Sequence, residues 1–236
     1  GNTCLSALRD MPALGQPARN TSKGCGGVMR VAPAGLYAAA ASRGNDLQAA
    51  FDLGARLCAL THGHPTGILA GGVFAALTFA VVRDFTLPEG LAEAKSVLVS
   101  RPDHEEVLDA LTLAEKLANS TTPPHEAISQ LGAGWVADEA LAIALYCTLV
   151  ADDFRQGVLL AVNHGGDSDS TGAIAGNLLG AMHGIDAIPS EWLEPLELQD
   201  VIRELADDLV EFPDWRIDEY SFDEGAQRIW KKYPGF

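Results

Sequence analysis

The sequence contains few basic residues and few aromatic ones. Lys and Arg together number 16, against 32 Asp and Glu, so the formal charge is −16 at pH 7. Nucleic acids require a basic face on their partners, and an anionic membrane repels an acidic surface, so this charge argues against both as partners. Aromatic residues make up 7% of the chain and hydrophobic residues 47%, a composition typical of a globular protein with small core side chains.

Cysteines are also scarce, and no two of the four form a Cys-x-x-Cys pair. In a chain of this length they favour a reducing compartment over a disulfide scaffold, so we expect the cytoplasm. The longest apolar run, residues 68–82, is short for a membrane span and predicts a buried helix. The first residues lack the basic start and the apolar stretch of a signal peptide, so we expect none.

Strand-like alternation of apolar and polar residues is almost absent, and no internal repeat or low-complexity linker occurs. Frequent Ala and Leu at helical spacing instead predict a single all-α domain over residues 1–236, with a loop over residues 1–27. Helices are expected over residues 33–42, 46–60, 68–82, 91–99, 105–117, 138–150, 153–162, 171–183 and 192–210. Five tail aromatics are expected to pack back on the body: Trp215, Tyr220, Phe222, Trp230 and Tyr233.

The most informative stretch is NHGGDSDSTG, residues 163–172. Asp167 and Asp169 are followed by Ser170, and such a set of hard oxygen donors suits Mg²⁺, Ca²⁺ or Mn²⁺. The preceding pair of glycines allows the chain to turn sharply. An alternative is that Asp169 or Ser170 only caps the next helix. An EF-hand loop is excluded, because its twelfth position requires Glu and here is Leu178.

A second loop, NTSKGCGGVMR at residues 20–30, is rich in glycine. Closely spaced glycines expose backbone N–H groups, which can form a nest for phosphate oxygens. The loop lacks the Gly-Lys-Ser/Thr of a Walker A motif and the third glycine of a dinucleotide fingerprint, and an ordinary loop stays an alternative. His62 and His64 follow in THGHP, residues 61–65. They are candidates for three roles: metal ligands, helix caps or contacts to a bound ligand. Zinc is excluded, since no third His or Cys has the required spacing.

Four stretches in order resemble the ADP-ribosylglycohydrolase family, whose bacterial type member reactivates dinitrogenase reductase. They are SKGCGGVMRVAP (22–33), THGHP (61–65), GWVADEA (134–140) and NHGGDSDSTG (163–172). The resemblance implies an all-α orthogonal multi-helix bundle with two Mg²⁺ or Mn²⁺ ions. It also implies hydrolysis of the glycosidic bond between ADP-ribose and a side chain of an ADP-ribosylated protein. Arginine is the expected acceptor, because the form Gly24-Cys25-Gly26 looks like that of the nitrogenase-regulating branch.

The same resemblance assigns roles to individual residues. Arg30 matches a loop anchor, and Trp135 and Glu139 are given only packing and helix-start roles. His62 matches a histidine that contacts ADP-ribose. The expected metal ligands are Asp167, Asp169 and Ser170. The expected ADP-ribose-binding loop comprises Ser22, Lys23, Gly24, Cys25 and Gly26, around the diphosphate.

One departure from the family pattern concerns the metal motif Thr-Asp-Asp-Thr and an upstream catalytic acid. The chain contains neither, and the pairs at 152–153 and 207–208 are interpreted as solvated surface. The chain therefore looks like the C-terminal two-thirds of such a domain, with catalytic residues expected before Gly1 and little activity of its own. Alternatives are a non-catalytic ADP-ribose-binding relative of the immunity or crystallin kind, and a metal-dependent nucleotide phosphohydrolase.

Overall fold

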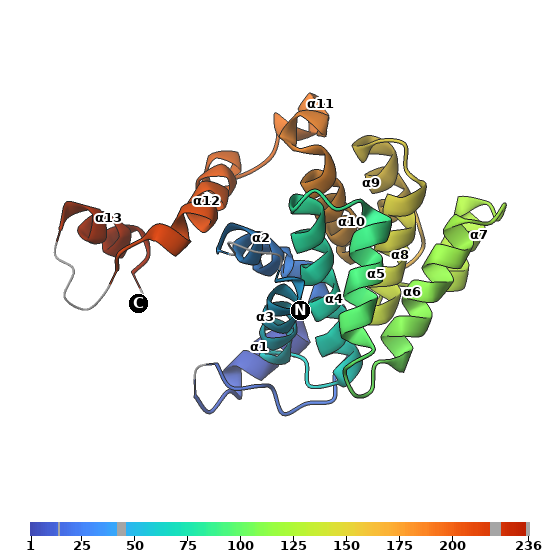
Figure 1. The fold of residues 1–236 in the computed structure, drawn as a ribbon, viewed down its shortest axis with the longest axis horizontal. Helices are drawn as coiled ribbons and strands as arrows, with labels where there is room; N and C mark the ends of the chain where they lie inside the picture. The colour runs from blue at the N-terminus through green and yellow to red at the C-terminus, as the bar shows by residue number, and fades with distance from the viewer. Residues whose placement is uncertain (14, 42–45, 218–222, 235–236) are drawn as a thin grey trace.

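The structure, a computed structural model, describes residues 1–13, 15–41, 46–217 and 223–234. Over these residues it is all helical, as predicted, and its one extended pairing is an isolated bridge between Gly24 and Val136. Most helices stand together in one body, while α12 and α13 extend from it beyond α2 (Figure 1). The α-helices are α1 (Asn2–Arg9), α2 (Ala32–Ala41), α3 (Leu47–Ala59), α4 (Pro65–Val82), α5 (Leu87–Leu98), α6 (Glu105–Ala118), α7 (Pro124–Leu131), α8 (Ala137–Val150), α9 (Phe154–Val162), α10 (Ser168–His183), α11 (Ser190–Leu193), α12 (Gln199–Glu211) and α13 (Glu224–Lys232). The 3₁₀ helices are η1 (Val28–Arg30), η2 (Ile185–Ala187) and η3 (Phe212–Asp214).

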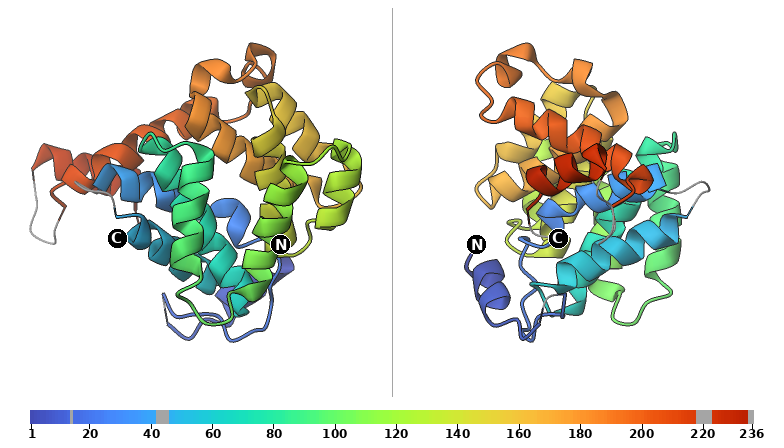
Figure 2. Two further views of the ribbon diagram at one scale, coloured as in Figure 1. Left: turned by 45° about the vertical axis from the view of Figure 1, so that its right-hand side comes forward. Right: turned by 90° about the vertical axis from the view of Figure 1, so that its left-hand side faces the viewer.

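Helix α4 is the centre of the body. It carries no charged residue, so it can bury every face, and 83% of it lies inside the protein. Its length and composition would also suit a membrane span, but this burial makes it a core helix. Helices α2, α3, α5, α8 and α10 pack around it (Figure 2). The approach of α3 is close, because a Cβ on Gly54 would lie only 2.6 Å from the carbonyl oxygen of Gly71.

Several helices begin earlier than the apolar pattern predicts. Helix α4 starts at Pro65, which suits the first helical turn, and the His64 side chain caps it by accepting from the Thr66 N–H at 3.2 Å. Helix α5 starts after Thr86, which forms a capping box with Glu89. These starts were missed because the first turns are polar and carry no hydrophobic periodicity.

The helix predicted over residues 192–210 is wrong as a single element. Pro195 follows the short α11, and Leu198 has a left-handed φ of 59°, so the chain turns before α12 begins. Helices α1, α7 and α13 were not predicted, and α1 makes the expected loop over residues 1–27 wrong at its start. The expected end of the 33–42 helix, at Ser42, lies outside the described residues.

The C-terminal helix pair, α12 and α13, is joined to the body through aromatic contacts. The ring of Phe212 lies 5.8 Å from that of Tyr37 on α2. The Trp215 ring lies 5.5 Å from Phe212 and 6.0 Å from Tyr233, so these two aromatics pack within the C-terminal region, and the ring that contacts the body is that of Phe212, which was not among the five predicted. Tyr220 and Phe222 lie outside the described residues. None of the residues of α12 is buried.

Candidate active site

The glycine-rich loop lies between the first turns of α4 and α8. The carbonyl of Ser22 accepts from the His64 N–H at 3.3 Å, which joins the loop to α4. On the other side the carbonyl of Lys23 accepts from the Ala137 N–H at 2.8 Å. The Cys25 N–H donates to the carbonyl of Trp135 at 3.1 Å. These backbone hydrogen bonds fix the position of the loop between two helix N-termini, where anions are favoured.

The acidic loop meets the glycine-rich loop directly. The Cys25 thiol donates to Oδ2 of Asp167 at 2.7 Å, although the two residues are 142 positions apart. The Ser170 hydroxyl lies 3.4 Å from the same sulfur, and it donates to Sδ of Met29 at 3.3 Å. Burial, followed by the hydrogen bond to Asp167, raises the pKa of Cys25 to about 11, so its thiol stays protonated at neutral pH. The two segments that the sequence singled out are therefore in contact.

A third segment, residues 132–139, positions the acidic loop. The Asp167 N–H donates to the carbonyl of Ala133 at 2.7 Å, and a Cβ on Gly166 would clash with that same oxygen. Glycine is thus required at 166 for this close approach; neither Gly165 nor Gly166 has a positive φ. The Glu139 carboxylate accepts from the N–H groups of Ala133 and Gly134, each at 3.0 Å. Glu139 is therefore more than a helix-start residue, because it fixes this turn.

The predicted capping alternative for the acidic loop is wrong. Asp167 occupies the N-cap position of α10 without a side-chain cap bond, and both Asp169 and Ser170 lie inside the first turn. Helix α10 begins at Ser168, so the side chains of its first turn project from a helix whose next residues are buried. The carboxylates of Asp167 and Asp169 therefore do not cap α10.

His62 lies beneath the glycine-rich loop and is 1% exposed. Its Nδ1 is 2.8 Å from Oγ1 of Thr61, which also accepts from the Arg30 guanidinium at 2.6 Å. A Cβ on Gly27 would lie 3.1 Å from the ring, so the glycines let the loop pass closely over the imidazole. Burial, together with the charge on Arg30, lowers the pKa of His62, so the ring is neutral at pH 7. Arg30 anchors this part of the loop, as expected.

The backbone N–H groups of the glycine-rich loop are only partly available to a ligand. Those of Ser22 and Gly24 donate to the side chains of Asn20 and Ser22, and that of Cys25 is bound to Trp135. Among the described residues, no acceptor is found for the N–H groups of Lys23, Gly26 and Gly27. Gly27 is buried, so the partly exposed Lys23 and Gly26 carry the donors that a diphosphate could use.

Two carboxylates and a hydroxyl offer a partial fit to a hard divalent cation. Asp167 is 8% exposed, and Asp169 is exposed on the same turn. Burial acts to raise the pKa of Asp167, but interactions with Cys25, Asp169 and Ser170 outweigh it and hold the pKa below its usual value. Within the described part of the chain, no cluster of three or more His, Cys, Asp or Glu side chains suits a metal ion. The oxygen donors are the type that Mg²⁺ and Mn²⁺ prefer, yet they supply only part of a coordination shell.

Two residues behave differently from the sequence-based prediction. Trp135 is 62% exposed, so the packing role given to it is wrong; its carbonyl holds Cys25 while its indole faces solvent. The ammonium of Lys23 is paired with Glu106 on α6 at 2.9 Å. Sequence reasoning missed Glu106, because no local pattern links two residues that lie 83 positions apart.

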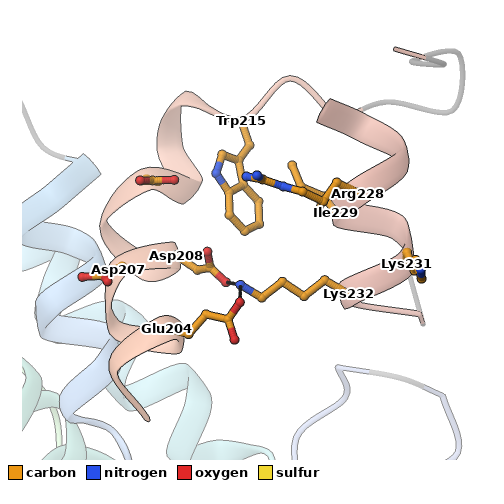
Figure 3. Close-up of a pocket in the computed structure, with 9 residues that line it drawn as sticks. Glu204, Asp207, Asp208, Trp215, Arg228, Ile229, Lys231 and Lys232 are labelled. Carbon is orange, nitrogen blue, oxygen red and sulfur yellow. Dashed lines mark ion pairs between the residues drawn. The ribbon is translucent and has the colours of Figure 1, made fainter. Parts of the chain in front are cut away.

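A cavity of about 560 Å³ lies away from this site, between α12 and α13. In it Lys232 reaches between Glu204 and Asp208 and pairs with both (Figure 3). Its lining is therefore a set of paired charges, and it contains none of the predicted site residues. The acidic pairs interpreted as solvated surface are partly structural, since Asp208 binds Lys232 and Asp153 caps α9.

Comparisons with known proteins identify the family of this chain. The family model described as ADP-ribosylglycohydrolase matches residues 1–217. An uncharacterized protein of Archaeoglobus fulgidus is 35% identical over 192 residues, which cover 79% of this chain and 58% of that protein. The ADP-ribosylarginine hydrolase Tri1 of Pseudomonas putida is 26% identical over 190 residues, covering 80% of this chain and 46% of that protein. The chain thus spans about half the length of these curated relatives.

The fold is matched as well. The solved structure of an ADP-ribosylglycohydrolase-related protein complex superposes with a TM-score of 0.68 at 29% sequence identity, covering 90% of this chain and 69% of that one. Helix α13 lies beyond the residues that the family model matches, whereas every predicted site residue lies within them. Since that match spans nearly the whole sequence, the chain belongs to the ADP-ribosylglycohydrolase family.

Proposed function

We propose that this chain carries the ADP-ribose-binding part of an enzyme that hydrolyses the bond between ADP-ribose and an arginine side chain of a protein. The observation that carries the proposal is the 2.7 Å contact between Cys25 and Asp167. It puts the nest of free N–H groups next to the acidic turn, so one ligand can reach both. We choose arginine as the modified side chain because Tri1, a relative over 80% of the chain, is an ADP-ribosylarginine hydrolase.

In this proposal the glycine-rich loop binds the diphosphate. The free N–H groups of Lys23 and Gly26 would donate to its oxygens, and the neutral His62 ring would support the loop from below. The chain is strongly acidic, so local donors of this kind are needed to offset its overall field. Held in this way, the diphosphate directs the attached ribose toward Asp167.

Asp167, Asp169 and Ser170 would hold Mg²⁺ or Mn²⁺, two ions in the complete site. When bound, such ions act as Lewis acids that orient the ribose hydroxyls and a water molecule. Hydrolysis breaks the bond between the anomeric carbon and the guanidinium nitrogen; the water oxygen joins the carbon, and a proton goes to the nitrogen. The residues of this chain would bind and orient the substrate, and we assign none of them as the acid or base.

Calorimetric titration with ADP-ribose, with and without Mg²⁺, tests the proposal. We expect binding that Mg²⁺ strengthens and that Asp167→Asn weakens by at least about tenfold, as expected when a metal ligand is lost. Glu105→Gln on α6 removes the same charge from an exposed position and is the control. Equal binding by Asp167→Asn and the unchanged chain would refute the metal role.

Product analysis then separates the candidate reactions. We expect this chain alone to release little ADP-ribose from an ADP-ribosylarginine peptide, because it supplies only one acidic turn to the site. Binding without any release would favour the non-catalytic alternative if the longer relatives also fail to turn over the peptide. Release of phosphate from ADP-ribose would point to a phosphohydrolase instead. A cytoplasmic location is part of the proposal; all four cysteines are free thiols, as a reducing compartment allows.

A further inference from the structure

One side-chain cluster connects the glycine-rich loop to two helices. Oε2 of Glu106, in the first turn of α6, accepts from Nζ of Lys23 at 2.9 Å. The same oxygen accepts from Oγ1 of Thr66, in the first turn of α4, at 2.6 Å. Thr66 is 1% exposed, so the base of the cluster is buried although the ion pair itself is partly open to solvent.

This cluster is the only ion pair among the described residues that involves the glycine-rich loop. The other attachments of residues 22–25 to α4 and α8 are backbone hydrogen bonds. The loop also lies directly on α4, because a Cβ on Gly67 would be only 3.3 Å from Cα of Lys23. A tether at Lys23 therefore acts on the part of the loop that lies against α4.

The charges around Lys23 oppose its use as a phosphate ligand. The hydrogen bond to Glu106 is the main cause that raises the pKa of Lys23, and Asp138 and Glu139 add to it. A phosphate that took the ammonium from Glu106 would leave that carboxylate unpaired beside two further acids. It would also leave the Thr66 hydroxyl as the only partner of Glu106. The backbone N–H groups of the loop are available without this loss.

We propose that Glu106 is a positioning residue for the glycine-rich loop, acting through Lys23, and that the Lys23 ammonium serves this tether instead of binding the diphosphate. The tether itself is a property of the free protein. Its effect on a ligand rests on the proposed function, so the two are tested separately.

Hydrogen exchange of the loop amides tests the tether on the full chain without ligand. Glu106→Gln keeps an acceptor for Thr66 and removes the ion pair, and Lys23→Met removes it from the other side. We expect each to speed exchange of the hydrogen-bonded Gly24 and Cys25 amides by about three- to fivefold, the size of one exposed ion pair, and the double variant to add nothing. The charge-swapped pair Lys23→Glu with Glu106→Lys should recover protection, whereas the control Glu105→Gln should change nothing. Unchanged exchange in both single variants, or additive effects in the double variant, would overturn the tether.

Titration with ADP-ribose tests the second half of the proposal. If the ammonium only holds the loop, Lys23→Met and Glu106→Gln weaken binding by the same few-fold factor, and the charge swap restores it. If the ammonium binds phosphate, Lys23→Met weakens binding while Glu106→Gln strengthens it, which would overturn the proposal. Absence of ADP-ribose binding by the unchanged chain would reject the proposed function, and hydrogen exchange would still decide the tether.

Discussion

The body around α4 and the C-terminal helix pair are stabilised by different kinds of contact. In the body, helices meet through fully buried aliphatic side chains and glycines, and Leu77 on α4 is 0% exposed. In the helix pair, α12 buries no residue, and Leu205 stays 47% exposed. An edge-to-face contact between Phe212 and Trp215 and the ion pairs of Lys232 hold that region instead. Every predicted site residue belongs to the body, so the precision of the site depends on packing there and not on the tail.

The largest expected effect contrasts one leucine from each region. Leu77→Ala should lower the free energy of unfolding by about 2–5 kcal/mol, because it leaves a cavity between closely packed helices. Leu205→Ala on α12 should change it by about 0.5 kcal/mol, since an exposed side chain loses little on truncation. Urea denaturation followed by circular dichroism measures both. Similar losses for the two variants would show that α12 is buried against something in solution.

A smaller effect contrasts two helical glycines. A Cβ on Gly71 would overlap Sγ of Cys58 on α3, so Gly71→Ala should destabilise the protein by about 1–3 kcal/mol through overpacking. Gly176 on α10 has open space, its nearest contact being 3.9 Å away on Val158, so Gly176→Ala should stabilise by about 0.5–1 kcal/mol. Thermal unfolding measures the two shifts, and we expect them to have opposite signs. Stabilisation by Gly71→Ala would contradict the close packing of α3 on α4, and destabilisation by Gly176→Ala would contradict the open space at Gly176.

The sequence was sufficient for most helices of the body, although α1 and α7 were missed. Helical periodicity identified α3, α6, α8 and α9 nearly to the residue, because each combines an apolar side with a polar or capped start. It failed at the turn before α12, where Pro195 and the left-handed Leu198 override amphipathic spacing. Amphipathic spacing continues on both sides of this turn, so the spacing alone does not reveal that the helix is interrupted.

The motifs in the sequence drew attention to Asp167 and the glycine-rich loop, but they do not show how the two are held. The contact between Asp167 and Cys25 is long-range, and no local pattern indicates it. The supports at Ala133, Glu139 and Glu106 follow from tertiary packing, which brings three helix N-termini to one place. The motifs thus contain the candidate ligand-binding residues, whereas some residues that support them lie outside any motif.

The smallest expected effect is confined to the helix pair and depends on pH. The hydrogen bond from Lys232, followed by that from Tyr233, lowers the pKa of Asp208 in the folded state. Its stabilising contribution is therefore present above the unfolded pKa of about 3.9 and is lost as the pH falls through the lower folded value. Hydrogen bonds to Asp208 and Glu204 raise the pKa of Lys232 to about 12, so the contribution of Lys232 is present below its unfolded pKa of about 10.4 and is lost as the pH rises through 12.

Hydrogen exchange of the α13 amides, corrected for the intrinsic dependence on pH, should thus show constant protection between about pH 4 and 10 and a loss at either side. Lys232→Met should reduce the protection within that range by about two- to threefold, because exposed ion pairs contribute little and salt screens them. Lys231→Met, the neighbouring exposed lysine, is the matched control and should have no effect. The hydrogen-bonded amides of Gly24 and Cys25 in the glycine-rich loop should not respond to either variant. A response there would mean that the helix pair is coupled to the site, and the separation between the two regions would fail.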